Sequence, residues 1–123
     1  MKKRGRIEQL WAYEKYRVMY HSQKHYEQIR AALKGEPSYD AVAHLIESAK
    51  AVPPTRGSMV NAFDHMWGYF KNRCDEAEKV QYGKLKHDFL SGDTPDSAVI
   101  AFLHDLSEKY NVEYLCQSSL LEL

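Results

Sequence analysis

Hydrophobic residues recur at helical spacing along most of the chain, and segments with Gly, Pro or capping residues separate the helical stretches. The first stretch carries an apolar stripe, at about 100° per residue, formed by Ile7, Trp11, Val18, Ile29 and Leu33. Gly35 and Pro37 follow, and both residues stop helices. The spacing therefore predicts one long helix from about residue 7 to residue 34.

The rest of the chain predicts five shorter helices. Ser38 caps the second. Ser58 or Thr55 can cap the third, which spans residue 59 to about 73. A capping box at residues 75–78 starts the fourth. Thr-Pro at residues 94–95 begins the fifth, and a short last helix follows Asn111.

These elements predict an all-α fold, a single helical-bundle domain of about six helices with a long first helix. A chain of 123 residues suits one domain with a sizeable core. Residues 1–6 hold four basic side chains, so we expect them to form a basic flexible arm. Residues 7–123 then form the helical domain.

Charge is unevenly distributed, although the formal net charge is zero. Residues 1–34 hold nine basic and three acidic residues, a formal charge of +6, and the remainder carries −6. A neutral total gives no global attraction to nucleic acid. Two interpretations stay open: the basic first helix packs on the acidic remainder, or it presents a surface for phosphates.

Polar groups interrupt the apolar stripe of the first helix. They lie in the middle of the stripe or on its edges, and they are Glu14, Lys15, His21, Ser22, His25 and Tyr26. Burying an unpaired polar group costs about 2 kcal/mol or more. These groups therefore either satisfy one another in the core or line a site.

The predicted third helix carries a second unusual face. Asn61, His65 and Gly68 share it, with Tyr69 at its edge. A glycine inside a helix costs about 1 kcal/mol relative to alanine, which is explained where a helix or a ligand approaches the backbone closely. We predict that the first and third helices pack so that His25 and His65 come close together.

Three segments carry recognisable patterns. Residues 14–26 read Glu-Lys-Tyr-x-x-Met-x-His-Ser-x-x-His-Tyr, residues 57–71 read Gly-Ser-x-x-Asn-x-x-x-His-x-x-Gly-Tyr-Phe-Lys, and residues 114–118 read Tyr-Leu-x-Gln-Ser. Together they resemble the YbgA-like family, a bacterial domain of unknown function. Some members adjoin an iron–sulfur domain similar to thiouracil desulfidases. The resemblance implies an all-helical fold, a link to nucleobase or nucleic-acid metabolism and a desulfidase-like partner protein, but no catalytic residues.

The preferred interpretation of these polar residues is a pocket for a small anionic ligand, such as a nucleobase or nucleotide. Lysines bind anions and tyrosines stack on bases. The candidate ligand-binding residues are Lys15, Ser22, Tyr26, Asn61, Tyr69 and Lys71. The candidates for proton transfer are His21, His25 and His65. Whether a reaction follows binding stays open.

Other interpretations also stay open. Tyrosines interleaved with basic residues in the first helix suit a nucleic-acid or protein adaptor, and a buried polar network would suit a structural scaffold. His21 and His25, spaced i and i+4, could bind a metal ion with His65. We expect no metal there, because Lys15 nearby disfavours a cation.

Cysteine content and hydrophobic segments bear on location. Cys74 and Cys116 have no metal-type spacing, so we expect reduced thiols and no iron–sulfur cluster in this chain. No apolar segment follows the basic start, and no apolar run is long enough to span a membrane. The sequence therefore predicts a cytoplasmic protein without a membrane partner.

Overall fold

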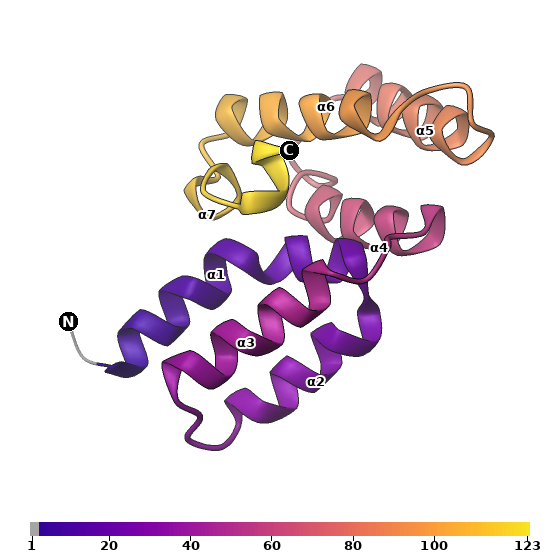
Figure 1. The fold of residues 1–123 in the computed structure, drawn as a ribbon. Coiled ribbons are helices and arrows are strands. Elements are labelled where there is room, and N and C mark those ends of the chain that lie inside the picture. The colour runs from indigo at the N-terminus through magenta and orange to yellow at the C-terminus, as the bar shows by residue number, and fades with distance from the viewer. Residues whose placement is uncertain (1–2) are drawn as a thin grey trace.

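All regular secondary structure in residues 3–123, the part of the chain that the computed structural model describes, is helical. Figure 1 shows the helices, with α1, α2 and α3 packed side by side and α5 paired with α6. Their bounds are α1 Lys3–His21, α2 Gln23–Leu33, α3 Tyr39–Lys50, α4 Arg56–Trp67, α5 Glu76–Leu90, α6 Asp96–Lys109, α7 Glu113–Cys116 and the 3-10 helix η1 Ser119–Glu122. The predicted all-α domain is confirmed.

The predicted single helix over residues 7–34 is wrong, because the chain reverses at Ser22. This residue has an extended backbone (φ −163°, ψ 114°), and its hydroxyl accepts a hydrogen bond from the His25 N–H as the N-cap of α2. Helices α1 and α2 therefore form an antiparallel hairpin joined by one residue. At its open end, the Arg4 guanidinium donates to the Leu33 carbonyl (2.9 Å).

The start of the chain differs in part from the predicted flexible arm. Residues 1 and 2 lie outside the described residues, whereas residues 3–6 form the beginning of α1. The Arg4 side chain also pairs with Glu8 (3.4 Å), and the Arg6 guanidinium lies 4.8 Å from the centroid of the Tyr39 ring. These two arginines are thus held against the chain, and α1 begins before Ile7.

Capping residues set the boundaries of the later helices. Ser38 caps α3, and the capping box at residues 75–78 starts α5, both as predicted. Thr55, one of the two predicted caps of the third helix, is the N-cap of α4 in a capping box with Ser58. The predicted end near residue 73 is wrong, because the helix ends at Trp67 with Gly68 as its C-cap. Gly68 is therefore not inside the helix. A Cβ at this position would lie 3.2 Å from the His65 carbonyl oxygen, so the chain's own backbone favours glycine there.

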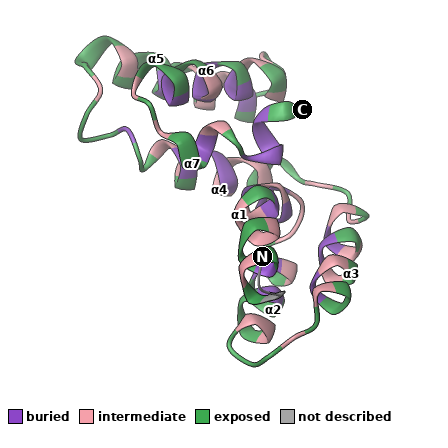
Figure 2. Ribbon diagram, turned by 90° about the vertical axis from the view of Figure 1, so that its left-hand side faces the viewer, coloured by how far each residue is buried: buried purple, intermediate pink, exposed green. Residues whose placement is uncertain are grey.

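Helix α1 is the central element of the core. It packs against α2, α3, α4 and η1, and Figure 2 shows buried residues on the inward faces of the helices. The largest fully buried side chains include Ile7, Met19, Ile29, Ile46, Phe63 and Phe70. Burying each such side chain stabilises the fold by about 1.5–3 kcal/mol. This burial fixes α1, and therefore fixes the polar side chains on its remaining faces.

Candidate functional site

Three tyrosine rings from distant parts of the chain meet beside α1. Tyr16 lies on α1, Tyr69 follows α4, and Tyr114 lies on α7. The Tyr16 ring meets Tyr69 and Tyr114 edge-on, at centroid distances of 6.5 and 6.4 Å. Tyr69 and Tyr114 stack on each other at 6.2 Å, and the Tyr16 and Tyr69 hydroxyls are hydrogen-bonded (3.1 Å). Tyr16 is buried, whereas the other two rings remain partly open to solvent.

Local structure explains why these rings meet. Tyr16 is held by the burial of α1, and its neighbours Val18 and Met19 are fully buried. Helix α4 ends at Gly68, so Tyr69 lies in the turn that follows. Leu115 is fully buried and anchors the short helix α7, which carries Tyr114 at the surface. Each ring is thus placed by an anchored neighbour in the chain.

Lys15 borders this group of rings, and Arg30, whose charge acts on Lys15, lies over a fourth tyrosine, Tyr26. The Lys15 ammonium lies 5.4 Å from the Tyr16 ring centroid, and the Arg30 guanidinium lies 5.7 Å from the centroid of Tyr26. Tyr26 stacks on Trp11, with ring centroids 5.7 Å apart. We call this group the tyrosine–lysine site, and its members are Lys15, Tyr16, Tyr26, Arg30, Tyr69 and Tyr114.

The tyrosine–lysine site carries positive charge without an acidic partner. Lys15 is half-buried, and neither Lys15 nor Arg30 forms an ion pair within residues 3–123. Burial, and secondly the Arg30 charge, lower the pKa of Lys15. Both causes mean that the folded chain disfavours the ammonium. An anion bound between the two cations would relieve this cost.

Burial keeps three phenols of the site protonated at ordinary pH. Burial, followed by the hydrogen bond with Tyr69, raises the pKa of Tyr16. Burial also raises the pKa of Tyr26 and of Tyr114. Tyr114 also borders a surface hollow of about 330 Å³, which Gln9, Ala12, Tyr13 and Gln117 complete. Amide and phenol groups thus extend the site toward the start of α1.

The structure brings together three of the predicted ligand-binding residues, namely Lys15, Tyr26 and Tyr69. Sequence reasoning missed three further members. Tyr16 and Tyr114 lie inside the patterned segments at residues 14–26 and 114–118, and Arg30 lies one helical turn after Tyr26. These positions could have marked the three residues as candidates, but they do not show that the residues meet in space.

Ser22, His25 and Asn61 lie at the corner between α1 and α2. The Ser22 hydroxyl and His25 Nδ1 are hydrogen-bonded (2.8 Å). The Asn61 side-chain amide donates to Gln23 Oε1 (2.7 Å), which links α4 to the beginning of α2. These bonds fix the reversal of the chain, and they give all three predicted residues a structural partner.

His21 is held by two bonds at the end of α1. Its Nδ1 donates to the Val52 carbonyl (2.8 Å), and its Nε2 accepts from the Arg17 guanidinium (3.2 Å). Since a carbonyl only accepts and a guanidinium only donates, the ring is the neutral Nδ1–H tautomer. Burial lowers the pKa of His21, in agreement with this assignment. Neither ring nitrogen is left for proton transfer.

Neither His65 nor Lys71 is a member of the tyrosine–lysine site. His65 is exposed, so its side chain does not form part of a buried polar network. Lys71 lines a groove between α4 and α5. Within residues 3–123, no three His, Cys, Asp or Glu side chains are placed to hold a metal ion. The histidine metal site considered from the sequence is therefore not formed.

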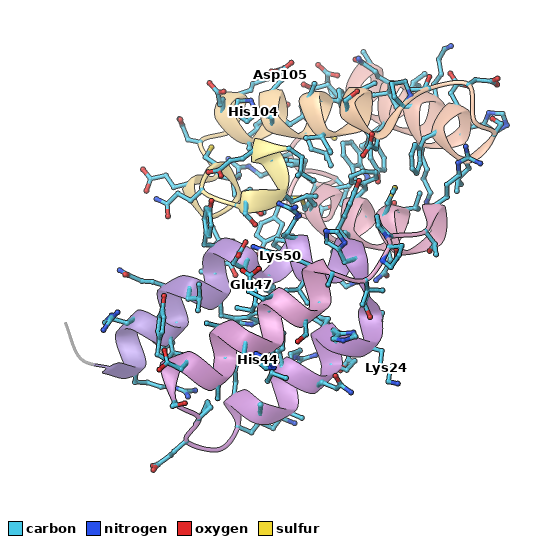
Figure 3. The ribbon with its side chains drawn as sticks, viewed as in Figure 1. Lys24, His44, Glu47, Lys50, His104 and Asp105 are labelled. Atoms are coloured by element: carbon cyan, nitrogen blue, oxygen red, sulfur yellow. The ribbon has the colours of Figure 1, made fainter. Side chains whose placement is uncertain are left out.

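The edge of the apolar stripe also carries Glu14, which is buried between α1 and α3. Its Oε2 accepts from the Lys50 ammonium (2.7 Å), and Glu47 also contacts that ammonium (3.2 Å). Figure 3 shows Glu47 and Lys50 together on α3. Because neighbouring helical residues point about 100° apart, fixing Glu14 toward α3 turns Lys15 away from this contact.

The fold and the site define a class: an all-helical domain with a positively charged, tyrosine-lined surface site. The chain belongs to the family described as "Protein of unknown function (DUF1722)", whose model matches residues 15–123. No curated protein and no solved structure matches the chain. The family match includes every member of the tyrosine–lysine site. Among the described helices, none has the length and apolar character needed to cross a membrane.

Proposed function

We propose that the tyrosine–lysine site binds a small anionic ligand of the nucleobase or nucleotide class. The observation that carries this proposal is Lys15, a half-buried cation beside Arg30 with no ion pair in the described chain. Taking a charge out of water without a partner is unfavourable. An anionic ligand supplies that partner, and charge-assisted hydrogen bonds to it are stronger than bonds between neutral groups.

The tyrosines supply recognition of a flat ring in this proposal. Tyr69 and Tyr114 each leave 39% of their surface exposed, and phenol rings stack on nucleobases at small entropic cost. Gln9 and Gln117, in the adjoining hollow, offer amide donors and acceptors to the edge of a base. The ligand's charge would lie at Lys15 and Arg30, and its ring against the tyrosines.

The proposal concerns binding rather than a reaction. His21 is bonded at both ring nitrogens and His25 at one. His65 is exposed at the surface. Of the three histidines proposed for proton transfer, His25 is the best candidate. Its Nδ1 is bonded to the Ser22 hydroxyl, which orients the ring, and its Nε2 has no hydrogen bond within residues 3–123.

The test compares two lysine variants in calorimetric titrations with uridine monophosphate and orotate. We expect Lys15→Met to weaken binding by about tenfold or more, the loss of one charge-assisted contact. The control is Lys24→Met, which removes the same charge from an exposed position on α2 that Figure 3 labels. It should change binding less than about twofold. Equal effects of the two variants, or no binding by the wild type, would reject the proposal.

The same change should not weaken the fold. Methionine keeps the length and apolar stem of lysine, and it removes an ammonium that the folded state disfavours. We therefore expect Lys15→Met to unfold at the same or a higher temperature than the wild type. A clear loss of stability would instead assign Lys15 a purely structural role.

A second candidate function is binding of single-stranded nucleic acid. Tyr13, Tyr69 and Tyr114 are all exposed, Tyr13 and Tyr114 border the same hollow, and Tyr69 stacks on Tyr114. Such a row suits the stacking of successive bases. This candidate predicts that affinity for an oligonucleotide falls steeply with salt. The first proposal instead predicts that a mononucleotide competes fully with the oligonucleotide.

We also propose a cytoplasmic location, a YbgA-like bacterial origin and a desulfidase-like partner protein. The support is the resemblance of residues 14–26 and 57–71 to the patterns of that family. Co-purification of the tagged chain with an iron–sulfur protein tests the partner. A chain recovered alone under anaerobic conditions would count against it.

A further inference from the structure

A groove between α4 and α5 gathers three lysines away from the tyrosine–lysine site. It has a volume of about 550 Å³, and its lining includes Asp64, Lys71, Lys79, Gly83 and Lys86. In Figure 1, α5 lies on the opposite side of α4 from the hairpin of α1 and α2. No residue of the tyrosine–lysine site lines the groove, so the two sites are separate.

The charge of the groove is positive. Its single lining carboxylate, Asp64, is already bonded: the Tyr82 hydroxyl donates to Oδ1 (2.7 Å), and the Lys86 ammonium donates to Oδ2 (2.9 Å). Lys71 is exposed and forms no ion pair within residues 3–123. The ammonium of Lys79 pairs with Glu76 at the edge of the groove (3.2 Å). Three lysines against these two carboxylates leave a formal charge of +1, and Lys71 is the lysine among them that has no ion pair within residues 3–123.

Gly83 gives an independent indication of a ligand. It lies inside α5, where glycine is less favourable than alanine. A Cβ at this position would meet nothing within 4 Å, so packing within the described chain gives no reason for glycine. Gly83 lines the groove, so its backbone is part of the groove's surface and no side chain covers it.

The aromatic side chains of the groove are already occupied. Trp67 stacks on Tyr82 at 4.5 Å with an interplanar angle of 9°, and both rings also stack with Phe102. These contacts leave less ring surface for a base, so the groove suits a phosphate group better than a nucleobase.

We propose that this groove binds a phosphate monoester, the dianionic group of a small phosphorylated molecule. A monoester carries up to two negative charges, so the positive groove attracts it strongly. The phosphate would lie between Lys71 and Lys79, against the open backbone at Gly83. A single nucleic-acid phosphodiester carries one charge, so the same lysines attract it less strongly than a dianion. This inference goes beyond the proposed function, since it concerns other residues.

The test follows backbone amide signals of the labelled protein by NMR during titration with inorganic phosphate. Saturable changes are expected at Lys71, Lys79 and Gly83. Lys71→Gln should weaken phosphate binding at least about fivefold. The control is Lys84→Gln, which removes one exposed lysine of α5 that pairs with Asp88 (3.4 Å) outside the groove. It should change binding less than about twofold.

Gly83→Ala separates a ligand site from a structural feature. Alanine should raise the midpoint of thermal unfolding by about 3–6 °C, because it favours the helix. It should also weaken phosphate binding, because its methyl group fills the space in front of the backbone.

Several results would overturn the inference: no saturable change with phosphate, equal weakening by Lys71→Gln and Lys84→Gln, or unchanged binding in Gly83→Ala. Stronger binding of an oligonucleotide that lacks a terminal phosphate would assign the groove to nucleic acid instead. Signals at Tyr69 and Tyr114 report the other site separately, so each proposal can fail alone.

Discussion

Removing the partner of a buried carboxylate should destabilise the hairpin core. Only 7% of the Glu14 side chain is exposed, and its Oε1 has no hydrogen-bond partner in the described chain. The Lys50 ammonium, 2.7 Å from Oε2, is its single ion-pair partner there. Lys50→Met therefore leaves a buried carboxylate without compensation, between α1 and α3.

The magnitude follows from burial. Breaking a buried ion pair by removing one partner costs about 3–5 kcal/mol. The Lys50 side chain is 23% exposed, so the ion pair lies near solvent. We therefore expect Lys50→Met to lower the free energy of unfolding by about 3 kcal/mol, the lower end of that range. The double variant Glu14→Gln with Lys50→Met removes both charges and should cost about 1 kcal/mol. The two changes should thus be strongly coupled.

Urea unfolding of the single and double variants measures this coupling. Lys24→Met, which changes the same charge at an exposed position, should lie within about 0.5 kcal/mol of the wild type. A loss below about 1 kcal/mol for Lys50→Met would refute the reasoning, and so would additive effects in the double variant.

The same pair predicts a pH dependence in alkali. Burial lowers the pKa of Lys50, but the hydrogen bonds to Glu14 and Glu47 outweigh it and the pKa is raised above 10.5. A raised pKa means that the folded state binds the proton more tightly than the unfolded state. This contribution is therefore complete below pH 10.5 and is lost as the pH rises through the folded pKa. The Lys50→Met variant should lack this loss.

Three further changes test the hairpin and the site. Ser22→Ala removes the N-cap of α2 and should cost about 1 kcal/mol in urea unfolding; an unchanged midpoint would contradict the capping role. Burial lowers the pKa of His21 below 6.5, so its contribution is present above pH 6.5 and is lost as the pH falls through the folded pKa. Between about pH 7.5 and 5.5 the wild type should therefore lose more stability than His21→Gln, and parallel losses would refute this. Tyr16→Phe removes the hydrogen bond with Tyr69 but keeps the ring, so thermal unfolding should show a loss of about 1 kcal/mol. A loss above about 3 kcal/mol would instead show that the ring packing depends on the hydroxyl.

Much of the helical architecture could be predicted from local signals. Ser38 and the capping box at residues 75–78 act within a few residues of the helices that they start, so the sequence alone reveals them. The reversal at Ser22 could not be predicted from spacing. Helical hydrogen bonds continue on both sides, from Ser22 N–H to Val18 and from Tyr26 N–H to Ser22. One residue with an extended backbone therefore interrupts a pattern that reads as continuous.

The candidate site was predicted only in part, for a different reason. Lys15 and Tyr26 lie on the hairpin and stood out because they interrupt or border an apolar stripe. Tyr114 joins them only because α7 folds back beside α1, a long-range packing that no local pattern reports. His65 and Lys71 are close to Tyr69 in the sequence. Lys71 nevertheless lines the groove beside α5, and His65 is exposed to solvent, so neither belongs to the site.

The most direct test of the central claim is an NMR titration of the labelled protein with orotate, a pyrimidine that carries a carboxylate and no phosphate. The account predicts saturable changes in the amide signals of Lys15, Tyr16, Tyr69 and Tyr114, and their loss in Lys15→Met. The absence of any change up to about 10 mM orotate, or changes confined to the groove between α4 and α5, would contradict it.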